Sequence, residues 1–285
     1  MSNIENPEKL LLCTDLDRTL IPNGFEPESK DSLKFFQQLV NHPQVTLVYV
    51  TGRDQDLVLQ AIEDYSLPTP DFVVANVGTS IYKISGKRWI YLEQWEKYIS
   101  DSWQGKVASQ IEEILINIDN LSLQEASKQN TYKLSYYVPL NTDYKTIIKN
   151  IKNILDTHSV IANLVWSEDE QADIGLLDIL PANAGKRQAI EFLINYLDFN
   201  YSNTIFSGDS GNDICVMSSP IQSILVANAN IKVKQAAIES ATNNNQIDTL
   251  YFAKGDYLNM NGNYSAGILE GIAYYMPQVE RLFRS

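Results

Sequence analysis

Two aspartates follow directly after an apolar run near the start of the chain. The run at residues 10–14 reads Leu-Leu-Leu-Cys-Thr, and Asp15 and Asp17 come next. Side chains two residues apart on an extended segment point to the same side, so both carboxylates should lie at the end of a buried strand. Like charges so placed repel unless a cation or a shared proton compensates them. The pair therefore indicates either a reactive site or an Asp-rich turn.

Three further polar clusters stand where predicted strands end or predicted helices begin: Thr51 with Arg53, Lys186, and Asp209 with Asp213. A phosphate ester is attacked in line while the charge on its oxygens is neutralised, which calls for a nucleophile, a divalent cation and fixed donors. Asp15 can be the nucleophile and form an aspartyl-phosphate. Asp17 can give a proton to the leaving oxygen and later take one from water, and we expect the crowded acids to raise its pKa toward the working pH.

The same clusters predict how a cation and a phosphate would be held. Mg²⁺ prefers oxygen ligands and keeps several waters, so Asp15 and Asp209 are candidate ligands, with Asp213 binding directly or through water. The predicted phosphate-binding residues are Thr51, Gly52 and Lys186, and the lysine also offsets the repulsion among the acids. Arg53 is interpreted either as a phosphate ligand or as a surface ion-pair partner.

Strands and helices alternate over most of the chain. Strands are predicted at residues 10–14, 45–50, 71–75, 204–207 and 223–227, with helices at 28–40, 55–65, 186–197, from 231 onward and at 263–275. This alternation predicts an α/β fold, a doubly wound and mostly parallel Rossmann-like sheet with helices on both faces. Ligands bind beyond the carboxyl ends of the strands in such sheets, which is where the clusters fall.

The alternation of predicted strands and helices breaks off near residue 81. An aromatic and amphipathic segment runs to about residue 118, followed by predicted strands at 121–126, 132–138, 160–166 and 174–180 with a helix at 144–156. We interpret the aromatic rings as core packing. The predicted domains are a catalytic core at 1–84 and 172–285 and an inserted α+β cap at 85–171.

Composition excludes several classes of function. The 285 residues carry 22 basic and 35 acidic side chains, a net charge of -13, which disfavours binding to nucleic acid or anionic lipid. No apolar run approaches the roughly 20 residues that span a bilayer. With two cysteines, a polar start and two histidines, we expect a soluble cytoplasmic protein without a disulfide framework, a histidine-rich zinc site or a serine–histidine triad.

The order of the clusters resembles the motif order of the haloacid dehalogenase-like phosphohydrolases. Their Asp-x-Asp-x-Thr motif matches residues 15–19, their strand-terminal Thr or Ser matches Thr51, their Lys matches Lys186, and their Gly-Asp-x-x-x-Asp matches residues 208–213. The resemblance implies that the backbone carbonyl of Asp17 is a further metal ligand. It also implies that the insert is a cap that selects the substrate.

Within this group the chain is most similar to sucrose-phosphate phosphatases, on segments at residues 51–53, 76–79, 133–137, 208–213 and 264–270. The resemblance implies magnesium-dependent hydrolysis of a phosphorylated disaccharide or glycoside, foremost sucrose 6-phosphate. Predicted substrate-binding residues are Arg53, Gly78, Thr79, Lys133, Tyr137 and Asn212. Tyr137 stands where related phosphatases often carry His, a departure on the glucose side of the substrate.

Other functions are compatible with the same residues. Mannosylfructose phosphate and glucosylglycerate phosphate are alternative substrates, and a sugar phosphomutase would pass the phosphoryl group to another hydroxyl instead of water. A sugar-binding protein without catalysis would not need to bear the repulsion among the acids. The expected partners are the sugar phosphate and, transiently, a sugar-phosphate synthase, with the chain as a monomer and without contact to nucleic acid or membrane.

Overall fold

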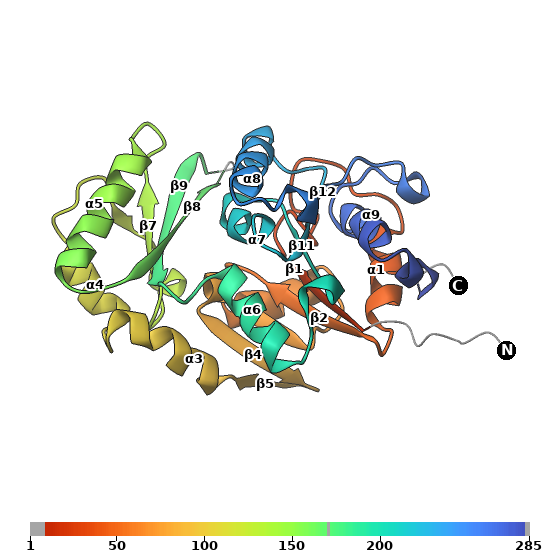
Figure 1. The fold of residues 1–285 in the computed structure, drawn as a ribbon, viewed down its shortest axis with the longest axis horizontal. Helices are drawn as coiled ribbons and strands as arrows, with labels where there is room; N and C mark the ends of the chain where they lie inside the picture. The colour runs from red at the N-terminus through yellow and green to blue at the C-terminus, as the bar shows by residue number, and fades with distance from the viewer. Residues whose placement is uncertain (1–8, 170–171, 283–285) are drawn as a thin grey trace.

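A computed structural model describes residues 9–169 and 172–282. Its larger sheet has eight strands, in the order β12 (Leu250–Phe252), β11 (Gln222–Leu225), β10 (Thr204–Gly208), β1 (Leu10–Thr14), β2 (Val45–Val50), β3 (Phe72–Ala75), β4 (Ser80–Ser85) and β5 (Arg88–Tyr91). The strands from β12 to β3 are parallel, and β4 and β5 add an antiparallel edge. The predicted doubly wound, mostly parallel core is confirmed (Figure 1).

Strand β1 lies in the middle of this sheet and is buried on both faces, which explains its uninterrupted apolar sequence. Leu10 and Leu12 pack in one core cluster, and Leu11 and Cys13 pack in the other. The first cluster is covered by α1 (Ser32–Val40), α2 (Gln55–Asp64) and α9 (Ser265–Tyr275). The second is covered by α3 (Glu93–Ser100), α6 (Lys186–Tyr196), α7 (Ile214–Met217) and α8 (Ile231–Asn243).

The cap has a second sheet of four antiparallel strands, in the order β6 (Ser122–Leu123), β7 (Leu134–Val138), β9 (Ile174–Pro181) and β8 (Ala162–Asp169). Helices α4 (Ala108–Leu115) and α5 (Tyr144–Thr157) cover one of its faces around the fully buried Trp103. Figure 1 shows both helices on the side of this sheet that is turned away from the core. The other face is therefore left for the space between the two lobes.

The sheets divide the chain differently from the predicted boundaries. Strand β5 and helix α3 fall within the predicted cap, yet β5 pairs with β4 in the core sheet and Trp95 of α3 packs in a core cluster. Strand β9 falls within the predicted core, yet it pairs with β7 and β8 of the cap. The strict alternation of strands and helices stops near residue 81 because an antiparallel hairpin of the core begins there. Such a change in the alternation indicates a change of strand direction and not the start of another domain.

Several element limits also differ. Helix α1 begins at Ser32 and not at residue 28, so a longer irregular loop follows β1. The strand predicted at 121–126 keeps only two residues, and β12 was not predicted. None of the helices within the described ranges is long and apolar enough to cross a membrane.

Candidate active site

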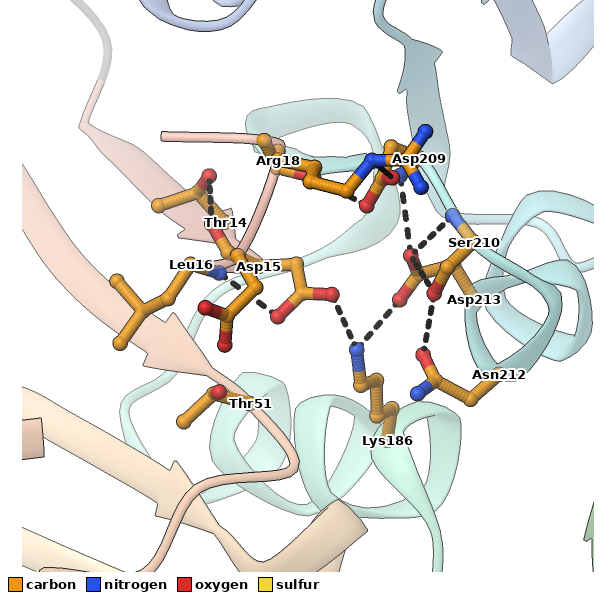
Figure 2. Close-up of polar contacts among 12 residues, drawn as sticks. Thr14, Asp15, Leu16, Arg18, Thr51, Lys186, Asp209, Ser210, Asn212 and Asp213 are labelled. Carbon is orange, nitrogen blue, oxygen red and sulfur yellow. Dashed lines mark hydrogen bonds and ion pairs between the residues drawn. The ribbon is translucent and has the colours of Figure 1, made fainter. Parts of the chain in front are cut away.

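Parallel neighbouring strands bring three of the clusters to one edge of the core sheet. Asp15 follows β1, Thr51 follows β2 and Asp209 follows β10, and β1 lies between the other two. Lys186 opens α6 at the same edge. Figure 2 shows the side chains of Asp15, Lys186 and Asp213 converging on one point.

Lys186 connects two of the acids. Its Nζ donates to Asp15 Oδ2 at 2.8 Å and to Asp213 Oδ1 at 2.7 Å, and all three side chains are buried. Burial opposes the charge on the ammonium, but the two carboxylates outweigh it and raise the pKa of Lys186. An ammonium group has three N–H donors. Two are used here, which leaves one for a further oxygen.

Asp15 is the most strongly desolvated member of the predicted pair. Burial raises its pKa to about 7 against the opposing effect of Lys186, and repulsion from Asp213 and Asp17 adds to the rise. Its Oδ1 accepts the backbone N–H of Leu16 at 2.7 Å, and its Oδ2 accepts from Lys186. The carboxylate is thus held by a donor on each oxygen, in a site that favours a further cation.

Asp15, Asp209 and Asp213 have carboxylate oxygens within 4.8 Å of one another, and no other cluster of potential metal ligands is found over residues 9–169 and 172–282. Burial, together with repulsion from Asp15 and Asp213, raises the pKa of Asp209 well above its usual value. Asp209 Oδ1 accepts from the Thr19 hydroxyl at 3.0 Å. Hard carboxylate oxygens that repel one another until a cation arrives fit the ligand preference of Mg²⁺.

Asp213 accepts more hydrogen bonds than the other two acids. Oδ1 accepts from Lys186, and Oδ2 accepts the backbone N–H groups of Asp209 and Ser210, each at 3.1 Å. A carboxylate so occupied is better suited to bind a cation through water than directly. It also fixes the loop that carries Asp209.

Asp17 is paired with Arg53, and its pKa is lowered and not raised as the sequence analysis expected. The guanidinium donates from Nε to Oδ2 at 2.8 Å and from Nη2 to Oδ1 at 2.6 Å, and Asn23 Nδ2 donates to Oδ1 at 2.8 Å. Burial alone would raise the pKa of Asp17, yet these hydrogen bonds and the charge of Arg53 lower it below the usual value. Charge-assisted, bidentate pairing outweighs the crowding by other acids on which the prediction rested.

Replacing Arg53 with Met should destabilise the fold at neutral pH but not in acid. A lowered folded-state pKa stabilises the protein above the usual carboxyl value of 3.8, and this contribution is lost as the pH falls through the lowered value. Thermal unfolding of Arg53→Met and wild type from pH 7 downward measures the difference. Arg187→Met, which removes a pair with Glu191 within one helix and away from the predicted catalytic acids, is the control. A difference that stays constant with pH would contradict the pairing.

A cavity of about 350 Å³ lies between the core and the cap in front of these acids. Its core wall includes Asp15, Asp17, Gly52, Arg53 and Asn212, and its cap wall includes Lys133 and Tyr137. Thr51 and Lys186 lie deeper, and the Thr51 hydroxyl accepts the backbone N–H of Arg53 at 3.2 Å. The volume is in the range of small-molecule sites.

Gly78 and Thr79 do not line this cavity, unlike the other predicted substrate-binding residues. A Cβ on Gly78 would come within 2.2 Å of the Gly185 carbonyl carbon, and its φ is +94°. The glycine is needed for close contact with the start of α6. The Thr79 hydroxyl instead accepts from Asn130 of the cap at 2.8 Å. Both residues support the site without facing it.

The cap wall also contains a polar group that the sequence analysis missed. Asp178 Oδ1 accepts from the Ser135 hydroxyl at 2.5 Å and lies 3.9 Å from Lys133 Nζ. Burial lowers the pKa of Lys133 despite the nearby carboxylate. Ser135 and Asp178 face each other across β7 and β9, a pairing of residues 43 apart that no local pattern indicates. Gln124 and Glu168 line the same wall.

The fold and site define the chain as a haloacid dehalogenase-like hydrolase with an α+β cap. The crystal structure of the sucrose-phosphatase from Synechocystis with sucrose and phosphate superposes with a TM-score of 0.77, at 24% identity over 94% of this chain and 98% of that one. The model of the sucrose-6F-phosphate phosphohydrolase family matches residues 8–276, and the chain belongs to this family of phosphoric monoester hydrolases.

Two relatives are similar to the chain over most of its length. A protein of Nitrosococcus oceani, named only as an HAD-like hydrolase, is 45% identical over 95% of this chain and 73% of its own length. An Arabidopsis thaliana protein with the name "Probable sucrose-phosphatase 3a" is 31% identical over 87% of this chain. The match covers 57% of the length of the plant protein.

Proposed function

We propose that the protein hydrolyses sucrose 6-phosphate to sucrose and inorganic phosphate, with Mg²⁺ as cofactor and an aspartyl-phosphate on Asp15 as intermediate. The observation that carries this proposal is the buried chain of contacts from Asp15 through Lys186 to Asp213, beside Asp209 and open to the cavity. Family membership supports the sugar phosphate as substrate class. A cytoplasmic, monomeric protein in transient contact with a synthase remains part of the proposal.

The first half of the reaction transfers the phosphoryl group to the protein. A carboxylate oxygen of Asp15 forms a bond to phosphorus as the bond to the sugar oxygen breaks. Asp17 gives a proton to that leaving oxygen. The third N–H of Lys186 and the Thr51 hydroxyl, at the same edge of the sheet as Asp15, would hold phosphoryl oxygens. Mg²⁺ held by Asp15, Asp209 and the Asp17 carbonyl, with Asp213 through water, would supply neutralising charge.

The second half regenerates the enzyme. Water gives a proton to Asp17 and attacks phosphorus, the bond to Asp15 breaks, and inorganic phosphate leaves. The hydrogen bonds and the charge of Arg53 lower the pKa of Asp17 and so favour its ionised form, which accepts this proton. In the first half Asp17 must hold a proton, which its bonds to Arg53 oppose. The phosphate of an arriving substrate competes for the same guanidinium and would release Asp17.

The cap wall suits the sugar part of the substrate. Sugar hydroxyls both donate and accept, and Asp178, Lys133, Gln124 and Tyr137 offer fixed acceptors and donors at the cavity. Ser135 engages only one oxygen of Asp178, so the carboxylate can still accept from a hydroxyl. A buried polar site of this kind rejects ligands that leave its groups unpaired.

Phosphate release across a panel of substrates tests the proposal. Sucrose 6-phosphate, mannosylfructose phosphate, glucosylglycerate phosphate and simple hexose phosphates are compared with and without Mg²⁺. We expect the highest kcat/KM with sucrose 6-phosphate and no release after chelation. A higher kcat/KM with another glycosyl phosphate would make that compound the substrate in place of sucrose 6-phosphate. Formation of an isomeric sugar phosphate without free phosphate would indicate a mutase.

A further inference from the structure

The loop that carries Asp17 has little regular structure of its own. Residues 15–31 connect β1 to α1, and they contain turns and an isolated bridge between Asp17 and Ile21 but no helix or strand. Arg18, next to Asp17, has a left-handed φ of 57°, which is costly for a residue with a side chain. Such a conformation persists only where the surroundings hold it.

The surroundings come from the far end of the chain. Asn228 Nδ2 donates to the Arg18 carbonyl at 2.6 Å, and Asn228 Oδ1 accepts the backbone N–H of Tyr264 at 2.9 Å. Tyr264, fully buried, has a left-handed φ of 51° and donates from its hydroxyl to the Glu26 carbonyl at 3.0 Å. Two strained residues, more than 200 positions apart in sequence, are thus joined through one buried asparagine.

Further hydrogen bonds extend the same contact. The side chains of Asn261 and Asn263 donate to the Pro27 carbonyl at 2.8 and 3.0 Å, and the Ser265 hydroxyl donates to the Ser32 hydroxyl at 2.8 Å. We call Asn228 together with residues 261–265 the clamp. It holds the loop at its beginning, its middle and its end.

The clamp is linked to the Asp17 carboxylate through Arg18 and Asn23. Arg18 is held on its other side too, because its N–H donates to Asn23 Oδ1 at 2.8 Å. The Asn23 amide nitrogen in turn donates to Asp17 Oδ1 at 2.8 Å. The position of the Asp17 carboxylate therefore depends on the backbone conformation of Arg18, and that conformation depends on Asn228.

Glu270 holds the end of β12 and the residues that follow it. Its carboxylate is buried and accepts the backbone N–H groups of Lys254 and Gly255 at 2.8 and 2.9 Å and the Tyr251 hydroxyl at 2.9 Å. This glutamate belongs to α9, the core helix that begins at Ser265 of the clamp. The residues at 264–270 thereby acquire a physical role.

We propose that Asn228 and Tyr264 are positioning residues. They hold Arg18 in its left-handed backbone conformation and thereby place Asp17 for proton transfer. The proposal rests on the proposed function of Asp17. It implies that Asn228, in the loop after β11, and Tyr264, in the segment after β12, are required for turnover and not only for folding.

The test compares Asn228→Ala and Asn228→Asp with Asn244→Ala in the full-length chain. Asn244 is the matched control, because its Nδ2 donates to the Ser218 carbonyl at 3.1 Å at the end of α8. Asn228→Asp preserves volume and the acceptor for Tyr264 but loses the donor to Arg18. We expect kcat to fall about 10- to 100-fold in both Asn228 variants with KM nearly unchanged, as small misplacements of reacting groups do. Asn244→Ala should keep the wild-type kcat.

Hydrogen–deuterium exchange of residues 15–31 without substrate gives a second measurement, independent of activity. We expect exchange about tenfold faster in the Asn228 variants and unchanged in Asn244→Ala. Unchanged exchange would overturn the clamp, and faster exchange with a wild-type kcat would overturn the positioning role. A wild-type chain that hydrolyses no phosphate ester would overturn the proposed function and the positioning role together, while the exchange data would still show whether the clamp holds the loop.

Discussion

Asp15→Asn is expected to lower turnover by roughly four or more orders of magnitude while the substrate still binds. The amide cannot form the acyl-phosphate bond, and removal of a nucleophile costs on this scale in other hydrolases that work through covalent intermediates. Turnover is measured as phosphate release, and binding by calorimetry with sucrose 6-phosphate. Asp143→Asn, which changes the N-cap of α5 in the cap without removing a capping oxygen, is the control.

The same substitution should alter stability with a defined pH dependence. The folded state holds a proton on Asp15 more tightly than the unfolded chain does, because burial raises its pKa to about 7. Wild-type stability should therefore fall as the pH rises from the usual carboxyl range through 7, and Asp15→Asn should escape this loss. Without Mg²⁺, the melting temperature of the variant should rise relative to wild type between pH 4 and pH 8.

For the activity of Asp15→Asn, turnover near the wild-type level would exclude Asp15 as the nucleophile.

Lys186→Met is expected to abolish activity and to lower the free energy of unfolding by about 3–5 kcal/mol at neutral pH, the usual cost of removing one partner of a buried ion pair. The ammonium lies 2.8 Å from Asp15 and 2.7 Å from Asp213, and removing it leaves two buried carboxylates facing each other. Urea unfolding measures the stability. The loss should shrink in acid, where the carboxylates take up protons.

Two comparisons sharpen this result. Lys34→Met on the exposed face of α1 should leave both stability and activity within experimental error of wild type. Lys186→Arg keeps the charge, but the planar guanidinium does not fit a pocket built for a compact ammonium, so activity should remain low. A Lys186→Met variant as stable as wild type at neutral pH would show that Asp15 and Asp213 are not both ionised.

Much of the core could be predicted from sequence because its signals are local. A strand buried on both faces must be apolar throughout, as β1 is, and parallel strands end at a common edge. These two rules suffice to bring Asp15, Thr51 and Asp209 together. The limits of the cap were not predictable in the same way, because β5 and β9 are assigned to a sheet by distant partners.

The set of reactive residues and the sheet edge where they meet could be predicted, since both follow from residue type and strand order. The partners of those residues depend on the folded arrangement of the chain. Arg53 lowers the pKa of Asp17, Gly78 packs against the start of α6 instead of lining the cavity, and Asn228 holds the Arg18 carbonyl. Hydrogen bonds and ion pairs act over a few ångströms in space, and chain separation carries no information about which groups come that close.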